Sequence, residues 1–202
     1  MLLIDYGQSN SGLNIFPSKP LLANQKDSDS SIKIEHYQLP AHQAPKHIPL
    51  QNAVVIFHQP ITRVRRRLGE KCQIERIKTG DIVVSPADVL HCARWEEPAN
   101  FTLLLLERDF LTRAAYEFKH SDRVELLPTF ARPDPVVYQI GLALKTEVQR
   151  DFGLGGKDFS QRRSSQKIYL DTAASFLAAH LLRYYSATGS SIDRRACCPI
   201  EI

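Results

Sequence analysis

The stretch GDIVVSPADVLHCARW, residues 80–95, constrains the fold more than any other part of the chain. Its opening Gly-Asp pair favours a turn, and the β-branched run that follows favours a strand. Pro86 and Asp88 interrupt this strand before a second one begins near His91. Two short strands joined by a turn, with a histidine aimed inward, indicate one rim of a small β-barrel.

The spacing within this stretch resembles the second conserved box of the cupin barrel. Gly80 is followed by five residues and Pro86, and Asp88 and His91 take the later positions of the box. The chain departs from the box at Asp88, where the family usually has glycine, and at Trp95, where an asparagine often stands. The resemblance implies a barrel that holds either a catalytic metal or a ligand-sensing pocket.

A metal centre in such a barrel needs three or four converging ligands, two of them from a His-x-His pair. The strand that should carry this pair, residues 53–60, has the sequence AVVIFHQP and offers His58 alone. Together with His91 this gives two candidate ligands, which cannot close a site. The remaining histidines of this half of the chain lie among Pro and Gln residues, at His36, His42 and His47. An irregular loop would not hold them in coordination geometry, so we expect no metal and no other cofactor.

The composition is typical of a globular protein with a full core, at 202 residues, 43% hydrophobic and 24% charged. The net charge of +4 is too small to indicate nucleic-acid binding through bulk electrostatics. The start, MLLIDYGQ, lacks a secretory apolar region, and the apolar stretch 173–182 is half a membrane span. The cysteines form no Cys-x-x-Cys pair and are Cys72, Cys92, Cys197 and Cys198. Reduced thiols and the absence of a membrane segment predict a cytoplasmic protein without membrane contact.

The composition and the hydrophobic pattern change along the chain. Residues 1–31 are rich in Ser, Asn, Gln and Asp and predict a loose N-terminal arm. Residues 32–106 hold short strand-like runs, with LGEK at 68–71 as a hairpin turn, and predict the barrel. Residues 107–186 turn helical, and residues 187–202 form a linker and tail. We therefore predict an α+β fold, a cupin-like β-barrel followed by C-terminal helices.

Three helices are expected after the barrel. ERDFLTRAAYEF has a helical apolar face, and Asp134-Pro135 supplies an N-cap followed by proline at the first helical position. The last helix, about residues 165–186, is apolar on both sides, so both sides must be covered. We expect one side to pair with a second copy of the chain. The anchors of this dimer interface would be Leu170, Leu177, Leu181 and Tyr184.

Two further patterns bear on chemistry. The arginines of the segment TRVRRRL, residues 62–68, flank a hairpin turn and predict a charged edge strand that discourages pairing. The chain has no Gly-x-Ser-x-Gly, no phosphate loop and no His-Glu-x-x-His motif. We therefore expect that the chain is not an enzyme, with a cupin-like metal-dependent enzyme as the alternative.

The order of these segments resembles the N-terminal sensing and dimerisation domain of AraC-type transcription regulators, over about residues 32–186. The runs VELLPTFARPDP and HLLRYYS carry most of this resemblance. In that family the arm and barrel form an effector pocket, the helices pair two subunits, and a C-terminal pair of helix-turn-helix motifs binds DNA. The last residues here, SATGSSIDRRACCPIEI, contain no amphipathic helix, so we expect no direct nucleic-acid binding by this chain alone.

The resemblance gives the expected function and partners. The chain would sense a small organic effector and dimerise, without a DNA-binding half of its own. His58, His91 and Trp95 would lie near the barrel mouth, where an aromatic ring and two polar groups could orient the effector. The expected partner is a second copy of the chain, or a full-length regulator in a mixed dimer.

Overall fold

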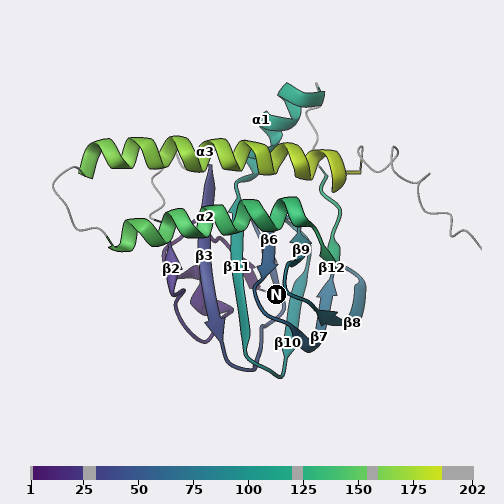
Figure 1. The fold of residues 1–202 in the computed structure, drawn as a ribbon. Helices are drawn as coiled ribbons and strands as arrows, with labels where there is room; N and C mark the ends of the chain where they lie inside the picture. The colour runs from purple at the N-terminus through teal and green to yellow at the C-terminus, as the bar shows by residue number, and fades with distance from the viewer. Residues whose placement is uncertain (1, 25–30, 120–124, 154–158, 188–202) are drawn as a thin grey trace, which may run out of the picture.

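A computed structural model describes residues 2–24, 31–119, 125–153 and 159–187. These ranges form two facing β-sheets of six strands each, and α-helices cover one of the sheets (Figure 1). The predicted class, an α+β fold with a cupin-like β-barrel followed by C-terminal helices, is confirmed. No helix in these ranges has the length and apolar character needed to cross a bilayer.

The helix-covered sheet is buried on both faces. Its strands, in spatial order, are β12 (Thr129–Pro133), β9 (Asp81–Ser85), β6 (Asn52–Phe57), β11 (Ala99–Leu106), β3 (Ile32–Leu39) and β2 (Leu22–Ala23). Along β6, Val54 and Ile56 face the helices, whereas Val55 and Phe57 face the barrel interior. Burial on both sides explains why β6 and β11 are continuous apolar runs and do not alternate with polar residues.

The second sheet closes the other side of the barrel. Its path runs through β1 (Leu2–Ile4), β5 (His47–Pro49), β10 (His91–Trp95), β7 (Ile61–Leu68) and β8 (Lys71–Ile77), with β4 (His42–Gln43) also paired to β10. The predicted LGEK hairpin joins β7 to β8, and Gly69 adopts the positive φ of 60° that this turn requires. The prediction that the arginines of residues 62–68 lie on a charged edge strand is wrong, because their strand, β7, is paired on both sides, with β10 and with β8.

Residues 80–95 cross from one sheet to the other. Gly80 has a φ of 87°, and the Asp81 carboxylate accepts a hydrogen bond from the Lys78 backbone N–H at 2.8 Å. The predicted turn before β9 is therefore confirmed. Asp88 also has a positive φ, 62°, in the connection to β10. Because β9 and β10 belong to different sheets, this connection carries the chain around the barrel.

The N-terminal segment differs from the expected loose arm. Strand β1 pairs in parallel with β5, and a short 3-10 helix follows at Ser11–Asn14. Ile4, Tyr6 and Ile15 are buried in the barrel core, and the Tyr6 backbone N–H donates to the Gln51 side chain at 2.9 Å. A few apolar residues spaced along a polar segment are enough to fix it to the barrel. The segment boundaries given above remain predictions.

The helices are α1 (Arg108–Lys119), α2 (Pro135–Gly153) and α3 (Phe159–Tyr184). The predicted N-cap of α2 is confirmed, since Asp134 Oδ1 accepts from the backbone N–H groups of Val136 and Val137 at 3.1 and 3.0 Å. Asp134 Oδ2 accepts from His180 Nε2 at 2.9 Å and from the Tyr185 hydroxyl at 2.6 Å. One carboxylate thus joins the start of α2 to the end of α3.

Most of the predicted dimer anchors are buried inside the chain and are not available for an interface. Leu170, Leu177 and Leu181 are 6%, 0% and 0% exposed and belong to the core that α3 forms with α1, α2 and the sheet. Tyr184 is 47% exposed. The helical stripe was identified correctly, but the chain's own helices cover it. From residue 164 onward, the other large apolar side chains that α3 exposes are Ile168, Tyr169 and Phe176.

Helix α2 approaches the sheet most closely at Gly141. A Cβ atom on this residue would overlap Ile56 Cδ1 of β6. With Ile56 in its present conformation, this approach requires a residue without a side chain, and it brings α2 directly onto β6.

The predicted tail and the four cysteines are only partly covered by the described residues. The linker and tail, 187–202, lie outside the described residues except for Ala187, and Cys197 and Cys198 lie there too. Cys72 and Cys92 are free thiols.

Candidate ligand-binding site

The barrel encloses a cavity of about 50 Å³ between its two sheets. Residues of both sheets line it, and the N-terminal segment contributes Tyr6, Ile15 and Phe16. This volume is larger than the roughly 10–15 Å³ that a single water needs, so the cavity can hold a small ligand in this conformation.

One wall of the cavity is aromatic. The rings of Trp95 and Phe101 lie 6.5 Å apart at a T-shaped angle, and Phe57 lies 6.1 Å from Phe101. Trp95 Nε1 donates to the Pro40 carbonyl at 2.9 Å, which fixes the indole while its face stays in the barrel. This wall offers apolar area and edge-to-face contacts to an organic group.

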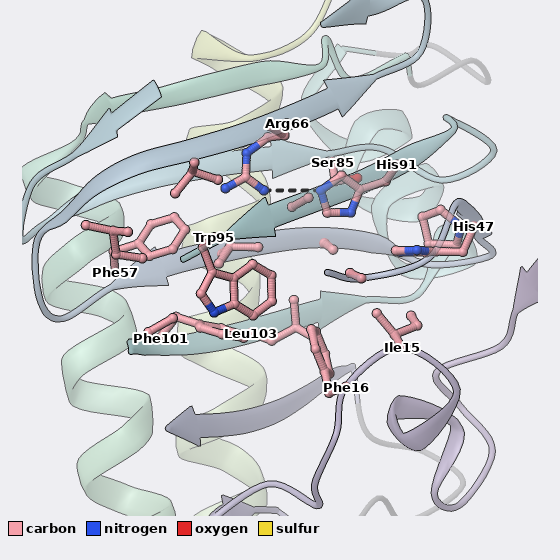
Figure 2. A pocket seen from close by; sticks show the side chains of 18 of the residues that line it. Ile15, Phe16, His47, Phe57, Arg66, Ser85, His91, Trp95, Phe101 and Leu103 are labelled. Atoms are coloured by element: carbon pink, nitrogen blue, oxygen red, sulfur yellow. Dashed lines mark hydrogen bonds between the residues drawn. The ribbon is translucent and has the colours of Figure 1, made fainter. Parts of the chain in front are cut away.

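The cavity also carries polar groups. Arg66, Ser85, His91 and His47 line it, and Figure 2 shows Arg66 beside His91. Arg66 Nε donates to Glu75 Oε2 at 2.7 Å, and both side chains are at least 96% buried. The second Glu75 oxygen accepts from the Ala131 backbone N–H at 2.5 Å. A buried ion pair with additional hydrogen bonds thus holds the guanidinium at the cavity.

The arginine also fixes the protonation of His91. Arg66 Nη1 lies 3.1 Å from His91 Nε2, drawn as a dashed line in Figure 2. Because guanidinium nitrogens only donate, His91 Nε2 must accept and its ring proton must be on Nδ1. Burial lowers the pKa of His91 well below its usual value, and the Arg66 charge and His47 lower it further. His91 is therefore neutral at pH 7.

Two buried polar atoms on the cavity wall have no hydrogen-bond partner among the described residues, His47 Nε2 and Ser85 Oγ. His47 Nδ1 donates to the Pro45 carbonyl at 2.8 Å, so Nε2 is the accepting nitrogen of a neutral ring. Burial lowers the pKa of His47. Buried polar groups are nearly always paired, and leaving one unpaired costs about 1–3 kcal/mol. These two atoms mark places where a ligand or water would complete the wall.

The structure brings two of the three predicted ligand-binding residues to the cavity. His91 and Trp95 line it, but His58 does not. Side chains alternate along a strand, and because Phe57 points into the barrel, His58 points to the helix-covered face. There His58 Nε2 forms a hydrogen bond of 2.7 Å with Thr102 Oγ1, and its ring centre lies 5.4 Å from that of His36.

Sequence reasoning missed Arg66, Ser85 and His47. Arg66 had a usable signal, since it shares the alternation of Val64 and Leu68, both of which point inward. Ser85 likewise follows the inward parity of the buried strand β9. His47 had none, because its Pro-rich surroundings indicated an irregular loop and not strand β5.

The residues of this cavity do not fit a metal ion. Within the described ranges, no group of three or more His, Cys, Asp or Glu side chains could hold one. His91 Nε2 already accepts from Arg66, which also places a fixed positive charge where a metal cation would bind. Glu75, the nearest carboxylate of this wall, is engaged by Arg66 and Ala131.

No protein-family model and no curated protein matches the chain. Solved structures do match, among them a conserved protein of unknown function from Streptococcus pyogenes, at 17% identity and a TM-score of 0.33 over 41% of this chain and 68% of that one. An oxalate decarboxylase from Bacillus subtilis, which has Mn(II) centres, matches at 15% and 0.34, over 39% of this chain and 22% of its own. A candidate mannose-6-phosphate isomerase from Ralstonia eutropha matches at 19% and 0.36, over 44% and 82%.

These neighbours include enzymes, which contradicts the expectation that the chain is not an enzyme. At 15–19% identity and TM-scores below 0.4, they assign neither an activity nor a ligand to this chain. A cupin-like barrel alone does not exclude catalysis, so the missing sequence motifs were insufficient ground for that expectation.

Proposed function

We propose that the barrel binds a small organic effector in its cavity and acts as the sensing domain of an AraC-type regulator. The observation that carries the proposal is a pair of buried atoms, Ser85 Oγ and His47 Nε2, that have no partner among the described residues and lie in a cavity with an aromatic wall. A largely apolar cavity with a few converging polar groups is typical of a small-molecule site.

A route from the cavity to the helices supports a sensing role. Val55 and Phe57 of β6 line the cavity, and Ile56 between them packs against Gly141 of α2. Because interiors are close-packed, a ligand that displaces β6 must also displace α2 or strain this contact. The same strand therefore forms a wall of the cavity and a support of the helical layer.

The proposed output is a dimer formed through α3. Ile168, Tyr169, Phe176 and Tyr184 expose 44–68% of their surface on this helix, and a second copy of the chain would cover them. Phe176→Glu should give a folded monomer by sedimentation, because it places a charge in the interface but not in the core. An unchanged dimer would exclude this face, and a monomeric unmodified protein would exclude dimerisation.

The fluorescence of Trp95, the single tryptophan of the chain, tests ligand binding directly. A metabolite panel is screened by this signal and by thermal shift. A ligand at one hundred times its Kd should stabilise the fold by about 2.7 kcal/mol, which raises Tm by roughly 5–10 °C for a chain of this size. Ser85→Ala should weaken the response, whereas the exposed Ser175→Ala should not. A panel without any response, or equal responses in both variants, would refute the site.

A cupin enzyme is the second candidate. The observation in its favour is the pair of imidazoles on the polar wall, His47 and His91, whose ring centres lie 5.1 Å apart. Incubation of the protein with a bound compound, followed by proton NMR, separates the two functions. Formation of a product that disappears in the His91→Phe variant would establish catalysis.

A further inference from the structure

The polar side of the cavity carries a single fixed charge. Of the lining residues that the structure describes, Arg66 is the one with such a charge, and it is buried. The guanidinium has five N–H donors, of which Glu75 takes the one on Nε and His91 takes one on Nη1. It can therefore donate to a third acceptor with its remaining N–H groups. Planar guanidinium groups bind carboxylates through such paired hydrogen bonds.

Ser85 adds an independent requirement for a hydrogen-bonding group in the same cavity, and its O–H can donate to an acceptor. The residue is 2% exposed, and its hydroxyl is buried with no partner among the described residues. It comes from β9, whereas Arg66 comes from β7 in the opposite sheet, and both side chains line the same cavity. A group that accepts from both would bridge the two sheets.

The rest of the cavity lining favours an apolar group on the ligand. The other lining side chains are mostly apolar, among them Trp95, Phe101 and Val55. A cavity of about 50 Å³ leaves room for a short chain only. A ligand with one polar end and a small apolar tail satisfies both ends.

We infer that the effector is a short-chain monocarboxylate, with its carboxylate on Arg66 and Ser85 and its tail against Trp95 and Phe101. This inference rests on the proposed function, because it names the ligand class of the same cavity. The guanidinium would then contact two carboxylates, the ligand and Glu75, so the remaining negative charge has to be offset by the other donors, the Ser85 hydroxyl and the Ala131 N–H. Glu75 keeps the Ala131 N–H as a further donor, so it does not depend on Arg66 alone.

The test compares matched ligands by Trp95 fluorescence and calorimetry. Butyrate should bind at least about tenfold more tightly than butyramide and 1-butanol, because a hydrogen bond to a charged group is worth more than one to a neutral group. Ser85→Ala should weaken butyrate binding by about tenfold without loss of Tm, since it removes an atom that has no partner among the described residues. Ser175→Ala is the matched control.

A double variant tests the charge without leaving a buried glutamate unpaired. Arg66→Met with Glu75→Gln should abolish the preference for butyrate over butyramide, and circular dichroism checks that the protein remains folded. If butyramide binds the unmodified protein as tightly as butyrate, the monocarboxylate inference is wrong while the effector site stands. If neither these compounds nor the metabolite panel binds, both are wrong. If the folded double variant keeps the preference, Arg66 is not the carboxylate-binding group.

Discussion

Asp134 makes a contribution to stability that can be worked out from its contacts. Its Oδ1 atom caps α2, and its Oδ2 atom accepts from His180 and Tyr185 at the end of α3. Burial alone would raise the pKa of Asp134, but the hydrogen bonds from His180, Tyr185 and the Val137 N–H outweigh it and lower the pKa to about 2. The carboxylate is therefore ionised at pH 7, and all its hydrogen bonds are charge-assisted.

Asp134→Ala should lower the free energy of unfolding by about 3–5 kcal/mol. The lost cap accounts for about 1 kcal/mol, and each lost hydrogen bond to the carboxylate for about 1.5–3 kcal/mol. Because these contacts share one side chain, their contributions are coupled and the total is less than their sum. Asp134→Asn keeps an acceptor for the cap and should cost less than the alanine variant.

Urea unfolding at pH 7, followed by circular dichroism, measures these changes. The double variant with Tyr185→Phe closes a thermodynamic cycle, in which the two substitutions should be less costly together than the sum of the single ones. Since the folded pKa lies below the unfolded value of 3.8, the contribution of Asp134 is present above pH 4 and is lost as pH falls towards 2. A loss below about 1 kcal/mol for Asp134→Ala, or strict additivity in the cycle, would refute the argument.

Three further outcomes are expected. Gly141→Ala should cost about 1–3 kcal/mol, because its Cβ would overlap Ile56, and Ile56→Val should recover part of the loss in the double variant; equal stability of the single variant and the unmodified protein would contradict this. Leu177→Ala should cost about 2–5 kcal/mol in thermal unfolding, since Leu177 is fully buried, and a cost under 1 kcal/mol would place it outside the core. Burial and the Lys145 charge lower the pKa values of His36 and His58 to about 4, so the unfolded chain binds protons first as pH falls. The stability that these two histidines contribute should therefore be present above pH 6.5 and decrease towards pH 4, by about 2 kcal/mol for His36 between pH 7 and 5. Replacement of both histidines by glutamine should make the urea-midpoint profile less steep, and the rest of the decrease would come from His47 and His91, whose pKa values are also lowered.

Local signals in the sequence predicted the parts of the fold that local chemistry determines. The Asp134-Pro135 pair specifies both a cap and a first helical residue, and the Gly80-Asp81 pair specifies a turn. In each case neighbouring residues supply both the constraint and the groups that satisfy it. The hairpin around Gly69 belongs to the same class. Such features need no knowledge of distant segments.

Choices that depend on distant segments could not be made in this way. The spacing of Leu170, Leu177 and Leu181 identified an apolar stripe, but the pattern does not say whether α1 and α2 or a second chain will cover it. The prediction that His58 lines the cavity was wrong for a related reason. Alternate side chains along β6 point to opposite faces, and the sequence does not say which face the barrel encloses. Arg66 was misjudged because arginine next to a turn is usually solvated, and only the register of β7 places it inside.

The contact between Gly141 and Ile56 also limits how sequences of this fold can vary. Any side chain at position 141 requires space that Ile56 now fills, so the helix position and the strand position should change together in related chains. A larger residue on the helix would be compatible with a smaller one on the strand, and the reverse exchange would leave a void. An engineer who transfers α2 to another barrel would therefore have to transfer both residues as a unit.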